Sequence, residues 1–272
     1  MRADGLRLTL LLGVATAAFA GGAGELQDYA PDPGTALVLA AYERAQDEGF
    51  LNQEASRDAT RITADTRRWL ERAEDLRGNP PVYHYLRARI EYDAYNRLPG
   101  TDLARADALD RALEHIQRFV EQKVRFADGY ALHGAILGQK IAANPGSALL
   151  HARAAKRATM TALRIDPDHQ LAHLNLGFTF ANTPEPFGGD RKAAVKHFRE
   201  AFAGSAAAPR AIAGVWLSIM HYQLGDSRQA AEVIEEVLEF APGFPLAAAT
   251  AQALADGADP LVYLERLQHD GE

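Results

Sequence analysis

Apolar residues recur along this chain with the period of an α-helix. In residues 55–77 the inward positions are spaced by four, three, four and three residues: Ile62, Thr66, Trp69, Ala73 and Leu76. This spacing places them on one helical face. The segment Gly78-Asn79-Pro80-Pro81 ends the pattern, because Gly and Pro terminate helices. The same period continues from Ala36 almost to the end, so we expect an all-α chain.

The pattern divides into hairpins, each made of two helices joined by a turn rich in Gly, Pro, Asn or Asp. The expected pairs are 36–48 with 55–77, 82–97 with 102–126, 128–143 with 147–165, 169–181 with 191–203, and the two halves of 211–244. Residues 247–254 and 260–267 predict a C-terminal capping pair. Asp259 is the expected N-cap there, with Pro260 at the first helical position.

The most regular hairpin is the segment 211–244, AIAGVWLSIMHYQLGDSRQAAEVIEEVLEFAPGF. It has a small residue in its first helix, Gly225-Asp226 at the turn, Ala230 five residues after that Gly, and Pro242 near the end. Together these marks resemble the tetratricopeptide (TPR) repeat, a helical hairpin of about 34 residues. The equivalent small positions are Ala88, Gly134, Gly177 and Ser218.

The resemblance is strongest over residues 127–244 and weaker over 36–126. It implies one domain over residues 36–272, because a lone hairpin cannot bury its apolar face and must stack on its neighbours. We therefore expect a right-handed α-solenoid of about five antiparallel helix pairs with a C-terminal capping helix or pair.

The first twenty residues have the pattern of a secretory signal peptide. Arg2 and Arg7 precede an apolar run that ends at Phe19, and Ala18-Phe19-Ala20 fits a cleavage site after Ala20. The run is too short for a good membrane span, and an uncleaved anchor is the alternative. No lipobox cysteine follows, which excludes a lipoprotein anchor. Residues 21–35 predict a flexible linker, so we expect a periplasmic or secreted protein with no stable membrane span after cleavage.

Composition narrows the classes of partner. The chain has 272 residues, 47% of them hydrophobic, which is enough for a sizeable core. It has no cysteine, so no disulfide can stabilise an exported fold. The net charge of −7 argues against nucleic acid as a partner, because phosphate binding requires a basic patch.

The resemblance also implies where a partner would bind, since the first helices of TPR hairpins line the concave side. The groove residues that it implies are Leu171, Leu174, Asn175, Phe178, Asn182, Ile212, Val215, Trp216, Ile219, Tyr222 and Gln223. An apolar and aromatic groove with an amide rim suits an extended peptide, an amphipathic helix or an apolar ligand. The alternative is that these residues are core, because a large exposed apolar patch is costly.

An insertion separates the helices of the fourth hairpin. Its sequence, Pro184-Glu185-Pro186-Phe187-Gly188-Gly189-Asp190, resembles a turn in a subset of exported bacterial TPR proteins. The two prolines block a helix, and Asp190 can cap the next one. Phe187 is a candidate recognition residue if it projects; alternatively, it packs back onto the adjacent helices.

No segment has the pattern of a catalytic motif. His169 and His173 are four residues apart, as in a two-ligand metal site, but no third ligand is evident nearby. We expect no enzyme activity, cofactor or metal. The sequence favours a non-catalytic scaffold or adaptor that binds a protein or peptide in the bacterial cell envelope. The alternative is a carrier of a small apolar ligand, or a helper subunit of a periplasmic solute transporter.

Overall fold

The structure is a computed structural model that describes residues 38, 41, 42, 45, 59–78, 80–98 and 103–269. The long helices are α3 (Ala59–Glu74), α4 (Pro80–Arg97), α5 (Leu103–Glu121), α6 (Ala127–Ala143), α7 (Ala148–Ile165), α8 (Gln170–Asn182), α9 (Arg191–Phe202), α10 (Ala207–Gln223), α11 (Ser227–Phe240), α12 (Pro245–Ala255) and α13 (Pro260–His269). Short 3-10 helices cover Pro145–Ser147 and Glu185–Phe187. These described ranges contain no strand.

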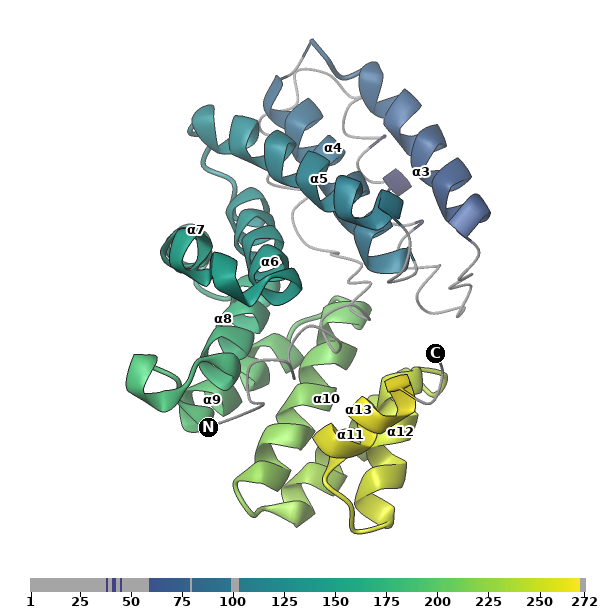
Figure 1. Cartoon of the computed structure of the whole chain (residues 1–272), viewed down its shortest axis with the longest axis vertical. Helices are drawn as coiled ribbons and strands as arrows, with labels where there is room; N and C mark the ends of the chain where they lie inside the picture. Colours follow the sequence, from purple (N-terminus) through teal and green to yellow (C-terminus); the bar gives the residue numbers. More distant parts are fainter. Residues whose placement is uncertain are drawn as a thin grey trace.

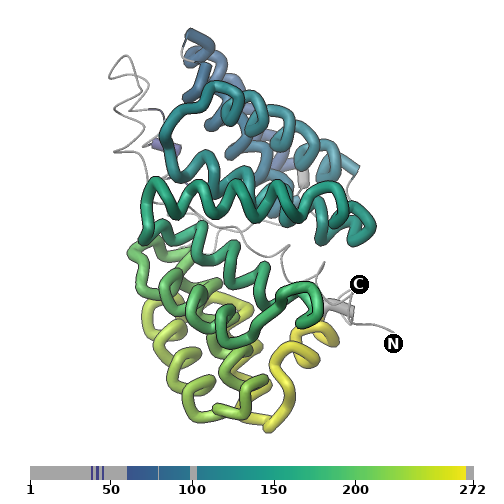
Figure 2. The backbone as a smooth tube through the Cα atoms, turned by 90° about the vertical axis from the view of Figure 1, so that its left-hand side faces the viewer, coloured from purple at the N-terminus to yellow at the C-terminus, as the bar shows by residue number. Residues whose placement is uncertain are grey.

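Consecutive helices pack as hairpins: α4 with α5, α6 with α7, α8 with α9, α10 with α11, and α12 with α13. The first helices of successive hairpins also contact one another: α6 contacts α8, and α8 contacts α10. The hairpins stack from α3 at the blue end to α13 at the yellow end (Figures 1 and 2). The fold is therefore the expected all-α solenoid, closed by the α12–α13 pair.

The small residue of each first helix allows its partner helix to approach closely. A Cβ added at Gly134 would lie 2.3 Å from Thr159 Oγ1, and one at Gly177 would lie 2.5 Å from the Phe198 ring. In the next hairpin, Ser218 Oγ donates a hydrogen bond of 2.7 Å to the Ala230 carbonyl. In these three hairpins the small position thus sets the spacing between the two helices.

Local sequence also determines the helix ends. Gly225 has a φ of 85°, a left-handed conformation that suits glycine, and the Asp226 carboxylate then accepts from the Gln229 N–H at 3.1 Å. At the C-terminal pair, Asp259 Oδ1 accepts from the Leu261 N–H at 2.9 Å, and Pro260 begins α13. The predicted cap is confirmed.

Several predicted helix ends are wrong by three or more residues. Helix α3 ends at Glu74 rather than 77. Helix α5 ends at Glu121 rather than 126, and Lys123 follows with a positive φ of 55°. The chain leaves the helix there, and the fully buried Phe126 ring packs 5.0 Å from that of Tyr85. Helix α10 begins at Ala207 rather than 211, because Pro209 is tolerated in a first helical turn.

The expected signal peptide (1–20) and linker (21–35) lie outside the described residues, as does most of the helix expected at 36–48. Of that helix, Val38, Ala41, Tyr42 and Ala45 are described, and all four are helical. Among the helices that the structure describes, none is long and apolar enough to cross a membrane.

Two glycines of α6 provide a matched test of the small position. We expect Gly134→Ala to lower the free energy of unfolding by about 1–3 kcal/mol, because its Cβ overpacks the contact with Thr159. Gly138→Ala should raise it by about 0.5–1 kcal/mol, since Ala favours a helix and nothing lies within 4 Å of the added Cβ. Urea unfolding followed by circular dichroism measures both. Equal effects at the two positions would contradict the close contact.

Candidate functional site: the α8–α10 face and the Phe187 loop

Most of the expected groove residues are core. Helices α8 and α10 pack against each other, and six of these side chains are only 0–4% exposed: Leu171, Leu174, Ile212, Val215, Trp216 and Ile219. The Phe178 ring lies edge-on, 5.2 Å from that of Trp216 and 5.3 Å from that of Phe198. The open apolar groove is therefore not found at these six positions, and the alternative that they are core fits their burial, because all six belong to the hydrophobic core cluster.

The other expected groove residues lie nearer the surface. Phe178, Asn182, Tyr222 and Gln223 are half-buried, the last three at the C-terminal ends of α8 and α10. Asn182 Nδ2 is buried without a hydrogen-bond partner. Asn175 has a structural contact instead, since its Nδ2 donates to the Ala131 carbonyl of α6 at 2.9 Å. Of the expected polar rim, Asn182 and Gln223 thus lie at helix ends, whereas Asn175 is part of the contact between α6 and α8.

Loop residues 183–190 after α8 are held by their own backbone. The Phe187 N–H donates to the Pro184 carbonyl at 2.8 Å, and the Asp190 N–H donates to the Phe180 carbonyl at 3.1 Å. Gly188 has a φ of 98°. A Cβ at Gly189 would lie 1.7 Å from the Thr183 carbonyl oxygen. Both glycines are therefore required by the turn.

This rigid turn presents Phe187 to solvent. Its side chain is 81% exposed, so it does not pack back onto the adjacent helices. Asp190 then caps α9 by accepting from the N–H groups of Lys192 and Ala193 at 2.8 and 3.1 Å. An exposed aromatic ring on an ordered loop costs little entropy when it docks into a partner.

A buried polar cluster lies on the first helices of the N-terminal hairpins. Arg89 Nε donates to Asp93 Oδ2 at 3.1 Å, and the Tyr42 hydroxyl donates to the same carboxylate. Burial raises the pKa of Asp93 against the opposing effect of Arg89. Between α6 and α8, His169 Nε2 bonds Asp128 Oδ1 at 2.8 Å. These side chains are at most 8% exposed and satisfy one another, which fits a structural role.

His169 and His173 do not form a joint site. His169 caps α8 and bonds Asp128, whereas His173 bonds the Pro167 carbonyl and His197. No group of three or more metal-ligating side chains converges within the residues that the structure describes.

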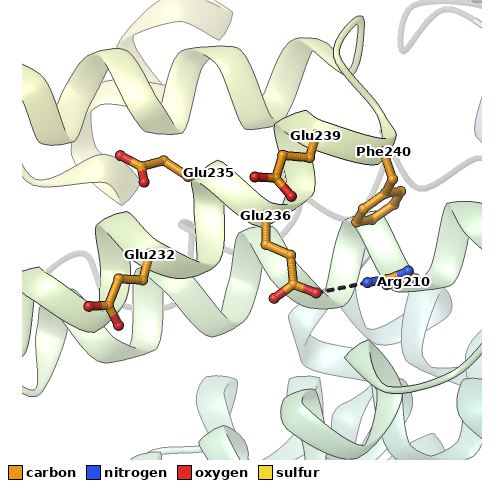
Figure 3. Close-up of a pocket in the computed structure, with 6 residues that line it drawn as sticks. All are labelled: Arg210, Glu232, Glu235, Glu236, Glu239 and Phe240. Atoms are coloured by element: carbon orange, nitrogen blue, oxygen red, sulfur yellow. Dashed lines mark hydrogen bonds and ion pairs between the residues drawn. The ribbon is translucent and has the colours of Figure 1, made fainter.

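An acidic pocket of about 640 Å³ lies on the outer surface (Figure 3). Four exposed carboxylates of α11 line it: Glu232, Glu235, Glu236 and Glu239. Arg210 at its edge bonds Glu236 at 2.8 Å, and its guanidinium lies 4.3 Å from the centroid of the Phe240 ring. Because Arg210 is engaged in this way, the pocket presents mainly negative charge.

Sequence reasoning missed two pairs of histidines that the structure brings together, His84 with His115 and His173 with His197. Each pair joins the two helices of one hairpin. A comparison of histidine positions between hairpins could have found them, whereas a search for linear motifs could not.

Comparison with solved structures supports the repeat architecture. The chain is similar to a thermophilic TPR protein from Thermus thermophilus, with a TM-score of 0.53 and 19% identity over 75% of this chain and 98% of that one. No protein-family model matches the chain, and no curated protein matches its sequence. At this identity the likeness establishes a TPR-like fold and nothing further.

Substitution of Trp216 distinguishes core from binding surface. We expect Trp216→Ala to lower the free energy of unfolding by about 3–5 kcal/mol, because it leaves a cavity beside Phe178 and Phe198. The exposed control Phe187→Ala should change it by less than about 0.5 kcal/mol. Urea titration measures both. If Trp216→Ala lowered the free energy of unfolding as little as Phe187→Ala does, the result would support an open groove instead.

Proposed function

We propose that this chain is a non-catalytic scaffold that binds a protein or peptide in the bacterial cell envelope, with Phe187 as its principal contact. The observation that carries this proposal is the 81% exposure of Phe187 on a loop fixed by its own hydrogen bonds. Aromatic residues presented in this way commonly dominate binding energy. The TPR-like fold supports the class, because such solenoids usually bind and do not catalyse.

The surroundings of Phe187 suggest the chemistry of the partner. Asn182 lies directly before the loop, and the exposed Arg191 and Lys192 directly follow it. Tyr222 and Gln223 end α10, which packs against α8. A matching partner would offer an apolar pocket for one aromatic ring, with acidic and amide groups around it. In this proposal only the rim of the expected groove contributes to binding, and most of its apolar residues stabilise the fold.

The envelope location rests on the sequence of residues 1–20. Arg2, Arg7, the apolar run and the cleavage pattern ending at Ala20 together favour export.

Site-specific photocrosslinking tests the proposed contact. A photoreactive amino acid at Phe187 should yield a discrete crosslinked species in envelope fractions of the native host. The same probe at Leu149, which is fully exposed on α7, should not. The Phe187→Ala variant should reduce capture of the same species at least about tenfold, as expected for a hot-spot aromatic. Equal crosslinking at both positions would contradict the proposal.

The carrier alternative makes a different prediction. Native mass spectrometry of protein purified from its own envelope would then show a reproducible bound small molecule, and Phe187→Ala would leave that molecule bound.

A further inference from the structure

The two histidine pairs have the same geometry. His84 and His115 approach with Nδ1 atoms 3.0 Å apart, and so do His173 and His197. One member of each pair lies on the first helix of a hairpin and the other on the second. Each contact therefore adds a polar connection between two packed helices, which in α4–α5 are also joined by the Arg111–Glu91 ion pair at 2.8 Å.

The pairs also occupy equivalent positions in the repeat. In each first helix the histidine lies four residues before the small position, Ala88 or Gly177. In each second helix it lies three residues after a buried alanine, Ala112 or Ala194. The α6–α7 hairpin between them has Tyr130 and Ala158 at these positions. Two hairpins thus share a polar contact that the intervening one lacks.

The ring geometry identifies the contact as an N–H···N hydrogen bond. The ring centroids lie 5.2 Å apart in one pair and 5.3 Å in the other, close to the N···N distance plus the two ring radii. Each ring therefore points its Nδ1 at the other.

The position of the protons follows in the α8–α9 pair. His173 Nε2 lies 2.8 Å from the Pro167 carbonyl oxygen, so it carries a proton and donates it. In neutral His173 the Nδ1 then has only a lone pair, and His197 Nδ1 must donate to it. Such a bond requires one Nδ1 without a proton, so it cannot form between two fully protonated imidazoles, which would also place two like charges face to face.

We propose that the two imidazole pairs are acid-opened latches: each pair helps to hold the helices of its hairpin together at neutral pH, and protonation of its rings favours the open hairpin. The latch is a property of the hairpins themselves, whether or not a partner binds. In the α8–α9 hairpin the histidine pair is connected to the Phe187 loop through Phe180. The Phe180 ring stacks on His197 at 5.5 Å between centroids, and the Phe180 carbonyl accepts from Asp190.

The α4–α5 pair resists protonation. Burial lowers the pKa of His115 to about 4, with Arg87 and His84 adding to the effect. Burial, Arg118 and Arg87 lower the pKa of His84. The opposing charges are Glu114 and Glu121 on α5, while Glu74 of α3 is paired with Arg87 at 2.6 Å.

The α8–α9 pair has a similar environment. Burial lowers the pKa of His197, with His173 and Lys196 adding to the effect and Glu200 opposing it. The α7–α8 turn places Asp166 and Asp168 on either side of Pro167. Helix α10, which packs against α8 and α9, carries His221, whose pKa is lowered by burial and by Arg199.

The sign of the pH effect follows from these shifts. Histidines with depressed folded pKa values contribute stability that is complete above the unfolded value of about 6.5 and is lost as pH falls toward the folded value. Local opening of α4–α5 and α8–α9 should therefore increase between about pH 7.5 and 5.0, where most carboxylates stay ionised.

Amide hydrogen exchange on the full chain tests the latches. After correction for intrinsic exchange rates, peptides from α4–α5 and α8–α9 should lose protection about tenfold or more between pH 7.5 and 5.0. Helix α6 carries His133, whose pKa is lowered by burial to about 4, so the α6–α7 hairpin should also respond to acid. Peptides from α12, which carries no histidine, should change far less and serve as the internal control. In His173→Asn, the amide Oδ1 replaces Nδ1 as the acceptor and takes up no proton. The α8–α9 hairpin should then lose most of its acid response, while α4–α5 keeps its own.

An acid response of α12 equal to that of α4–α5 and α8–α9, or an unchanged response of α8–α9 in His173→Asn, would overturn the proposal. If circular dichroism shows that this variant is unfolded at about pH 7.5, His84→Asn makes the same test on α4–α5, with α8–α9 as the intact reference.

Discussion

The structure depends on close approach of the two helices of each hairpin at one small residue. Gly134 faces Thr159, Gly177 faces the Phe198 ring, and Ser218 bonds the Ala230 carbonyl. A larger side chain at these points would separate the helices. With no cysteine to crosslink the chain, this packing and the stacking of neighbouring hairpins must supply the stability.

The same close packing determines which surfaces are available for binding. Because α8, α9 and α10 approach closely, Phe178, Phe198 and Trp216 fill the space between them. Aromatic residues that sequence position assigns to a groove thus become part of the core. What remains outside is the turn after α8, where a fixed backbone presents Phe187. Stability and proposed binding therefore use different aromatic residues of the same region.

The sequence predicts those features that depend on local chemistry. The period of the apolar residues and the identity of the turn residues were sufficient to predict the hairpins, the Asp259 cap and the Gly225 turn. The burial of Trp216 depends on the distance between hairpins, which no local pattern contains. The exposure of Phe187 depends on what lies opposite the loop. The His173–His197 contact depends on the register between two helices, so it is visible in sequence only when hairpins are compared position by position.

The α8–α10 face is closed around Trp216, while Phe187 is open to solvent. Iodide quenching of tryptophan fluorescence tests this in a Trp69→Phe background, where Trp216 is the single tryptophan. We predict that Trp216 is nearly unquenched, and that a tryptophan placed at Phe187 in a Trp69→Phe, Trp216→Phe background is quenched almost as strongly as free tryptophan. Strong quenching of Trp216 in the folded protein would contradict the account and indicate an open groove.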